Sequence, residues 1–361
     1  MSGHWQAWGK WGLLALSSWL AACAPTAETD ASRPAPTGRY EGKLTYRGSA
    51  LPVVINLYQD SASQAVQLQL RVPQLPVFAR WFDSVSYQAP ALNARLVGGR
   101  LALREETNFL TGSIWLHDTL RAELVAVRRG TAELPTYRVL HRPAAAGLPP
   151  HRYYLPVPDS GRQRPVVLLL PAATAAPAAQ GWADWLAAQG VAVAVLPLGA
   201  TAPDSVAARQ LRGALRQLKT DAVVRADSSR IGVWSLGPSG RAVVQVAADA
   251  GAVPAFLLLQ GGGFTTADRA LLRQLARRRR PVLALYGGAD TTVNGRESSR
   301  QLRQALGGRR GAPVRVYADA NAQLLRPTPA TDSVRSAWPQ LPPELLPGLQ
   351  QWLQGVLAPR R

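Results

Sequence analysis

The chain has 361 residues, 47% of them apolar, which is enough for about two domains with separate cores and excludes a wholly disordered protein. Its single cysteine, Cys23, excludes an intramolecular disulfide and a zinc site built from several cysteines. The formal net charge is +19, but the arginines are spread along the chain apart from one run at 277–280, so no nucleic-acid partner is expected.

Residues 1–22 have the features of a bacterial lipoprotein signal peptide. Lys10 precedes an apolar segment, 11–20, that suits a signal-peptide core and is too short to span a bilayer. The string Leu20-Ala21-Ala22-Cys23 resembles a lipobox, in which cleavage occurs before a lipidated cysteine. Ordinary signal cleavage beside an incidental cysteine is the alternative. We expect a membrane anchor on Cys23, a location at the cell envelope (periplasmic or outer-membrane), and a flexible tether at 23–37.

Residues 38–130 are predicted to form a small all-β domain. Apolar and polar residues alternate in the segments 51–59, 65–72, 94–105 and 112–128, which turn residues separate at short intervals. The pattern favours a meander, a sandwich or a small barrel. The string GRYEGKLTYRGSALPVVINL at 38–57 resembles the β domain that precedes the catalytic domain in many secreted α/β-hydrolases of Bacteroidetes type.

Residues 131–150 are expected to be a linker, and 151–361 a second domain in which buried strands alternate with helices. Apolar runs at 165–170 and 191–196 are typical of parallel strands that are covered on both faces. Further strands are expected at 230–234, 255–260, 281–286 and 314–317. Helices are expected at 180–189, 205–218, 241–250, 267–279 and 345–357. This alternation predicts a doubly wound, mostly parallel sheet.

Three strings of the second domain resemble α/β-hydrolases, with the best fit to secreted esterases and S33-peptidase-like members. Residues 227–248 resemble the nucleophile elbow, 281–290 the acid-bearing strand, and 333–357 the terminal segment. The resemblance implies an α/β-hydrolase fold and serine acyl transfer. That chemistry needs a serine on a strained turn, a histidine base, a carboxylate, and backbone N–H donors for the oxyanion.

The catalytic positions are mostly degenerate. An ungapped match puts Gly237 at the nucleophile position and Pro238 at the oxyanion position, so the hydroxyl and the N–H are both missing. The histidine position corresponds to Ala322, and only Asp290 fits its role as the acid. We therefore predict a lipid-anchored, catalytically impaired hydrolase that acts in binding or assembly, with a small molecule or protein in its cleft and with no cofactor or metal.

Two alternatives stay open. A shifted match makes Ser235 the nucleophile of an active carboxylic-ester or acyl hydrolase, with Asp290 as the acid. This match needs a gap on each side of the turn and leaves the base unplaced, because His151 is the last histidine of the sequence and nothing positions it or His141. The second alternative is a polyanion-binding lipoprotein that uses its arginine surface.

Overall fold

The computed structural model describes twelve stretches of the chain. They are residues 34–59, 65–82, 84–96, 99–116, 120–144, 147–158, 161–198, 203–249, 251, 254–307, 313–327 and 338–358. Cys23 and the predicted signal peptide lie outside these residues. Among the residues described, no helix combines the length and the apolar character that a membrane span requires.

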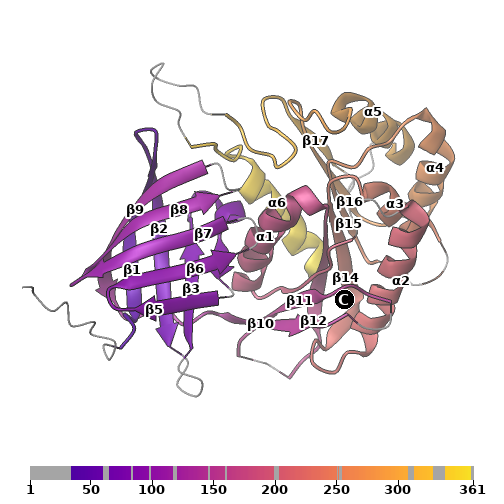
Figure 1. Ribbon diagram of the computed structural model, residues 1–361. Helices are drawn as coiled ribbons and strands as arrows, with labels where there is room; N and C mark the ends of the chain where they lie inside the picture. The colour runs from indigo at the N-terminus through magenta and orange to yellow at the C-terminus, as the bar shows by residue number, and fades with distance from the viewer. Residues whose placement is uncertain are drawn as a thin grey trace, which may run out of the picture. The chain divides into compact units, whose positions relative to one another are not determined.

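The first part of the described chain is an antiparallel sheet of nine strands (Figure 1). The strands are β1 (Gly38–Tyr46), β2 (Ser49–Gln59), β3 (Val66–Arg71), β4 (Arg80–Phe82), β5 (Ser84–Gln88), β6 (Ala91–Leu96), β7 (Gly99–Glu106), β8 (Phe109–Leu116) and β9 (Leu120–Gly130), with a short 3-10 helix, η1 (Pro76–Phe78), before β4. Their order in the sheet is β4-β3-β2-β1-β9-β8-β7-β6-β5. The two ends of this order approach each other, since β3 contacts β5 and β4 contacts β6, so the sheet forms a near-barrel.

Alternation explains why these segments form strands. In β7, for example, Leu101, Leu103 and Glu105 are buried, while Arg100, Arg104 and Glu106 are exposed. The structure divides two of the predicted segments. The range 94–105 contains the end of β6 and most of β7, and the range 112–128 contains parts of β8 and β9. Alternation predicts the strand state but carries no information on a hairpin turn inside the segment.

The second part is a mixed, mostly parallel sheet with helices on both faces, which confirms the predicted fold class: an all-β domain followed by an α/β domain. Its strands are β10 (Tyr137–Arg142), β11 (His151–Pro156), β12 (Arg164–Pro171), β13 (Ala192–Val195), β14 (Ala226–Leu236), β15 (Leu257–Gln260), β16 (Val282–Gly287) and β17 (Val314–Tyr317). The order is β10-β11-β13-β12-β14-β15-β16-β17. β11 is antiparallel to both of its neighbours, and all pairs from β13 to β17 are parallel.

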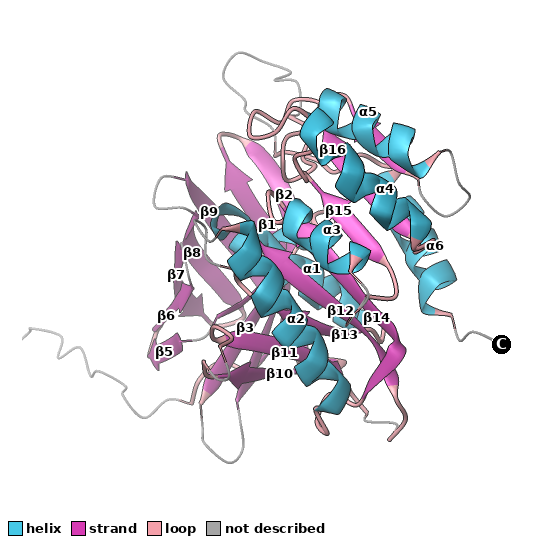
Figure 2. Ribbon diagram, turned by 90° about the vertical axis from the view of Figure 1, so that its right-hand side faces the viewer, coloured by secondary structure: helices cyan, strands magenta, loops and turns pink. Residues whose placement is uncertain are grey.

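In the part of the chain that the structure describes, six α-helices cover this sheet (Figures 1 and 2). They are α1 (Ala176–Ala188), α2 (Asp204–Thr220), α3 (Gly240–Ala248), α4 (Arg269–Arg277), α5 (Gly295–Leu306) and α6 (Leu345–Leu357). Helices α1 and α6 lie on one face, and their apolar residues share a core with the near-barrel. Helices α2 to α5 lie on the other face over a second core. Short 3-10 turns, η2 (Ala173–Ala175) and η3 (Thr266–Asp268), precede α1 and α4.

The expected linker, 131–150, contains an element of the sheet. Residues 137–142 form β10, which pairs with β11 from Tyr137 opposite Pro156 to Arg142 opposite His151. β10 is an edge strand and only one of its six residues, Tyr137, is buried. Because this strand is short and prolines flank it, its sequence resembles a connection.

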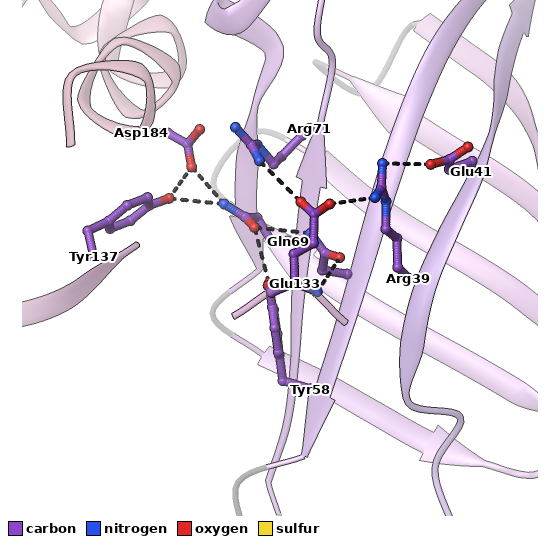
Figure 3. A network of polar contacts seen from close by, with 9 residues as sticks. Arg39, Glu41, Tyr58, Gln69, Arg71, Glu133, Tyr137 and Asp184 are labelled. Carbon is purple, nitrogen blue, oxygen red and sulfur yellow. Dashed lines mark hydrogen bonds and ion pairs between the residues drawn. The ribbon is translucent and has the colours of Figure 1, made fainter. Parts of the chain in front are cut away.

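A buried polar network joins the near-barrel to α1 (Figure 3). Asp184 of α1 is 5% exposed, and its Oδ1 accepts hydrogen bonds from Gln69 Nε2 at 2.8 Å and from the hydroxyl of Tyr137. Trp81 Nε1 donates to the Tyr137 oxygen at 2.5 Å. Burial and the Asp184 carboxylate raise the pKa of Tyr137, so the phenol stays protonated. The network thus ties β3, β4 and β10 to α1.

Candidate functional site

Residues singled out from the sequence, Gly237 and Asp290, follow parallel strands at one edge of the sheet, and Gly261 lies beside them. Gly237 follows β14, Gly261 follows β15, and Asp290 lies three residues after β16. The carboxyl ends of parallel strands meet at one edge, and α/β sheets commonly bind their ligands there. This edge is therefore the candidate site.

The turn between β14 and α3 consists of Gly237, Pro238 and Ser239. Gly237 has a φ of +102°, which favours glycine, and its N–H donates to the carbonyl of Gln260 at 2.8 Å. Pro238 is exposed and has no N–H to donate, while Ser239 Oγ donates to the carbonyl of Leu170 at 3.3 Å. The turn thus carries no free hydroxyl at Gly237 and no N–H at the residue that follows it.

One carboxylate oxygen of Asp290 accepts hydrogen bonds, and the other has no hydrogen-bond partner. Oδ1 accepts from the backbone N–H of Thr292 at 2.7 Å and from its hydroxyl at 2.6 Å, whereas Oδ2 is buried and has no hydrogen-bond partner. A Cβ atom added to Gly261 would lie 3.6 Å from Oδ2 and 3.7 Å from the Cα atom of Gly237. Asp290 Oδ2 and Gly237 therefore border the same small space.

Ala322 is linked to this space by a hydrogen bond with Gln260. Its carbonyl accepts a hydrogen bond from Gln260 Nε2 at 3.1 Å, and Gln260 is the residue whose own carbonyl binds the N–H of Gly237. No sequence pattern singles out Gln260, which ends an apolar strand segment and is followed by three glycines. Gly237, Asp290 and Ala322 thus come together, and of these three only Asp290 has a titratable side chain.

Ser235 lies inside β14, before the turn. It pairs with Leu170 of β12 on one side and Leu259 of β15 on the other, and it is 0% exposed. Its Oγ has no hydrogen-bond partner and points toward the start of α3, 3.5 Å from where a Cβ on Gly240 would lie. A substrate cannot reach Ser235 in this conformation, so its use as a nucleophile requires a rearrangement of the turn.

The two described histidines lie far from Asp290. His141 is in β10 and His151 in β11, and the path from β11 to β16 crosses β13, β12, β14 and β15. Five strand-to-strand steps of about 4.8 Å separate them by roughly 24 Å. Neither imidazole can serve Asp290 in this arrangement. The described residues also contain no group of three or more His, Cys, Asp and Glu that could hold a metal ion.

The two remaining predicted features are the lipidation of Cys23 and the arginine run at 277–280. Cys23 lies outside the described residues, so its lipidation stays a prediction. In the arginine run, Arg277, Arg278 and Arg279 are exposed, and Arg278 Nε donates to the carbonyl of Ala248 at 2.9 Å. This is the solvated end of α4, where cations complement the helix dipole.

No family model matches the chain, and no curated protein shows significant similarity to it, so the interpretation of this edge rests on its own geometry.

Proposed function

We propose that the second domain is a degenerate α/β-hydrolase that has lost serine acyl transfer and acts in binding or assembly. The strand order supports this proposal. Numbered along the chain from β10, the order is 1-2-4-3-5-6-7-8 with the second strand antiparallel, which is the arrangement typical of α/β-hydrolases. In that family the nucleophile follows the fifth strand, the acid the seventh and the histidine the eighth. Gly237, Asp290 and Ala322 follow the corresponding strands here.

The observation that carries the proposal is the chemistry of these three side chains. Acyl transfer requires a hydroxyl, a base within hydrogen-bond reach of it, and N–H donors for the oxyanion. A glycine, a methyl group and one carboxylate occupy the three positions, and Pro238 removes a donor. Triad removal alone leaves an acceleration of about 10³–10⁴ over water, which comes from the oxyanion hole and from binding. Because Pro238 removes an N–H donor from the oxyanion hole, this residual acceleration is expected to be lower as well.

Labelling with a fluorophosphonate probe tests the proposal. We expect no labelling of the purified mature protein, nor of Ser235→Ala and Ser239→Ala variants run beside it. Labelling of the wild type that disappears only in Ser235→Ala would show instead an active serine hydrolase. A variant in which the catalytic residues are restored gives the complementary test. We expect the triple variant Gly237→Ser, Pro238→Ala, Ala322→His to be labelled, and we expect the further change Asp290→Asn to reduce its rate of labelling. A folded triple variant that stays unlabelled counts against the assignment of these positions.

Membrane attachment through Cys23 is part of the same proposal and rests on the lipobox-like string. In detergent phase partitioning of whole-cell extracts, we expect the wild type in the detergent phase and Cys23→Ala in the aqueous phase. An unchanged distribution would contradict lipidation. The polyanion alternative is tested by heparin binding, which has to weaken steeply with salt if the arginine surface carries it.

A further inference from the structure

A pocket lies where the near-barrel meets α1 and α6, and its volume is about 460 Å³. Trp185 of α1 adds an aromatic side chain to the wall. None of Gly237, Asp290 and Ala322 lines this pocket. Pockets of about 300–1,000 Å³ accommodate small-molecule ligands. The apolar part of the wall consists of Val54, Val72, Pro73, Pro76, Ala79 and Ala188.

The carboxylate of Asp184 lines this pocket and has one oxygen free for a ligand. Asp184 is 5% exposed, and its Oδ1 accepts the hydrogen bonds from Gln69 and Tyr137 (Figure 3). Among the residues that the structure describes, Oδ2 has no hydrogen-bond partner, and it is not one of the fully enclosed polar atoms. Because Asp184 lines the pocket, Oδ2 meets solvent there and can accept a hydrogen bond from a bound molecule.

No cation of the described chain neutralises Asp184. Gln69 is uncharged, and Tyr137 stays protonated because burial and the Asp184 carboxylate raise its pKa. The buried cation of β4, Arg80, donates through Nη1 to two backbone carbonyls beside η1. A carboxylate that is taken out of water is costly unless an opposite charge compensates it. Asp184 is therefore a buried negative charge that a cationic ligand would stabilise.

The two arginines of the pocket lining are held by other carboxylates (Figure 3). Arg39 lies 2.6 Å from Glu41 and 2.5 Å from Glu133, and Arg71 lies 3.9 Å from Glu133. Together with Asp184, this cluster contains three carboxylates and two guanidinium groups. One negative charge is in excess, although the chain as a whole has a formal net charge of +19. The excess charge is that of Asp184, the carboxylate without an ion pair.

We infer that this pocket binds a small primary amine in its protonated form, with the ammonium group at Asp184 Oδ2 and the carbon body against the apolar wall. A hydrogen bond between an ammonium and a carboxylate is about twice as strong as one between neutral groups. Trp185 favours the same ligand, because aromatic faces attract cations. The inference does not depend on the proposed loss of catalysis, because none of the residues assigned there lines this pocket.

Isothermal titration calorimetry of the mature protein at pH 7 tests the inference with five probes. They are 2-phenylethylamine, hexylamine, neutral 2-phenylethanol, anionic 3-phenylpropionate and 2-phenylethyltrimethylammonium, a cation without an N–H donor. We expect one or both amines to bind at least about tenfold more tightly than the alcohol, equivalent to about 1.4 kcal/mol, and more tightly than the quaternary cation. We expect the propionate not to bind.

Three results would overturn the inference. They are equal binding of the amines and the alcohol, preference for the propionate or the quaternary cation, and no binding of either amine at millimolar concentration. Preference between the two amines distinguishes an aromatic from an aliphatic ligand.

Asp184→Asn assigns the effect to the carboxylate. The amide oxygen can still accept from Gln69 and Tyr137, whereas the negative charge is lost and an NH₂ group takes the place of Oδ2. We expect amine binding to weaken about tenfold or more and binding of the alcohol to stay unchanged. Unchanged amine affinity in a variant that circular dichroism shows to be folded would refute the assignment.

Gln350→Lys tests the pocket from a different element. Gln350 is an exposed residue of α6 in the pocket lining, so a lysine there adds a positive charge without disturbing a core. We expect amine binding to weaken, and if Asp184→Asn does not fold, unchanged affinity in Gln350→Lys refutes the assignment. Gln351→Lys is the matched control, because Gln351 is exposed on α6 and outside the lining, and we expect no change. Asp290→Asn is also expected to leave amine binding unchanged, which separates this pocket from the edge of the sheet.

Discussion

A glycine of α1 sets how closely this helix approaches the near-barrel. Gly181 is buried in the middle of α1 and lies against η1. A Cβ atom added to it would lie 2.2 Å from the carbonyl oxygen of Pro76 and 2.7 Å from the Cα atom of Val77. Both are backbone atoms, so no side-chain rotation relieves the clash. The Gly181→Ala substitution has to push α1 and η1 apart.

The size of the effect follows from two opposing contributions. In a helix interior, replacing glycine with alanine stabilises by about 0.5–1 kcal/mol. Against this, the gap to Pro76 has to widen from 2.2 Å to at least 3.0 Å. Overpacking of a tight interior costs about 1–3 kcal/mol, and the shift also strains the 2.8 Å bond from Gln69 to Asp184, which lies one turn further along α1. We expect a net loss of about 2 kcal/mol in the free energy of unfolding.

Gly213→Ala in α2 is the matched control. A Cβ atom there would meet only Leu148 Cδ2, at 3.6 Å, which is an ordinary contact. The same substitution is therefore expected to stabilise by about 0.5–1 kcal/mol. Urea unfolding of the mature protein, followed by tryptophan fluorescence and circular dichroism, measures both variants. If Gly181→Ala proves as stable as Gly213→Ala, the close contact between α1 and η1 is wrong.

Three further predictions concern stability. Asp184→Ala leaves the buried donors of Gln69 and Tyr137 without their acceptor and is expected to cost about 2–4 kcal/mol in urea unfolding; a loss below about 0.5 kcal/mol would contradict the network. Asn294 caps α5 by accepting from the Glu297 N–H at 3.0 Å, so Asn294→Ala is expected to lower stability by about 1 kcal/mol, and an unchanged thermal midpoint would speak against the cap. Hydrogen bonds from Ser229 and an ion pair with Arg230 lower the pKa of Asp227. The contribution of this carboxylate to the free energy of unfolding is present above the ordinary aspartate pKa. It is lost as pH falls through the lower pKa that Asp227 has in the folded protein. Asp227→Asn should therefore flatten the acid limb of a stability–pH curve by less than about 1 kcal/mol, and an identical acid limb would count against this.

The elements that the sequence predicts best are those with strong apolar signals. The strand at 314–317 and the helix at 345–357 have the predicted bounds, and the alternation of buried strands with helices is sufficient to predict the α/β class. The edge strand β10 was missed because it is only six residues long and lies between Pro135 and Pro143 in a segment that resembles a connection. The division of 94–105 between β6 and β7, and of 112–128 between β8 and β9, was missed because alternation has the same period in both strands of a pair.

The candidate sites depend on strand order, which local patterns do not encode. That Asp290 faces Gly237 could be anticipated only through the family resemblance. The role of Gln260 in joining Gly237 to Ala322 required the register of β14 against β15. The cross-strand row formed by His141, Arg152 and Val195 draws on three strands, and β13 lies beside β11 only because the connection from β12 through α1 returns to the place between β11 and β12. No spacing in the sequence marks this row.

The central position of β1 in the near-barrel has a consequence for how the domain folds. β1 hydrogen-bonds to β2 on one edge and to β9 on the other, and Arg39 near its start is paired with Gly130 at the end of the domain. Hairpins such as β1–β2 and β8–β9 can form early from neighbouring residues, but β1 and β9 meet only by closing a loop as long as the domain itself, which is slow. Until β9 has been synthesised, one edge of β1 stays open and can pair with other chains. The joining of β1 to β9 is therefore the step at which the folding of this domain is most exposed to aggregation.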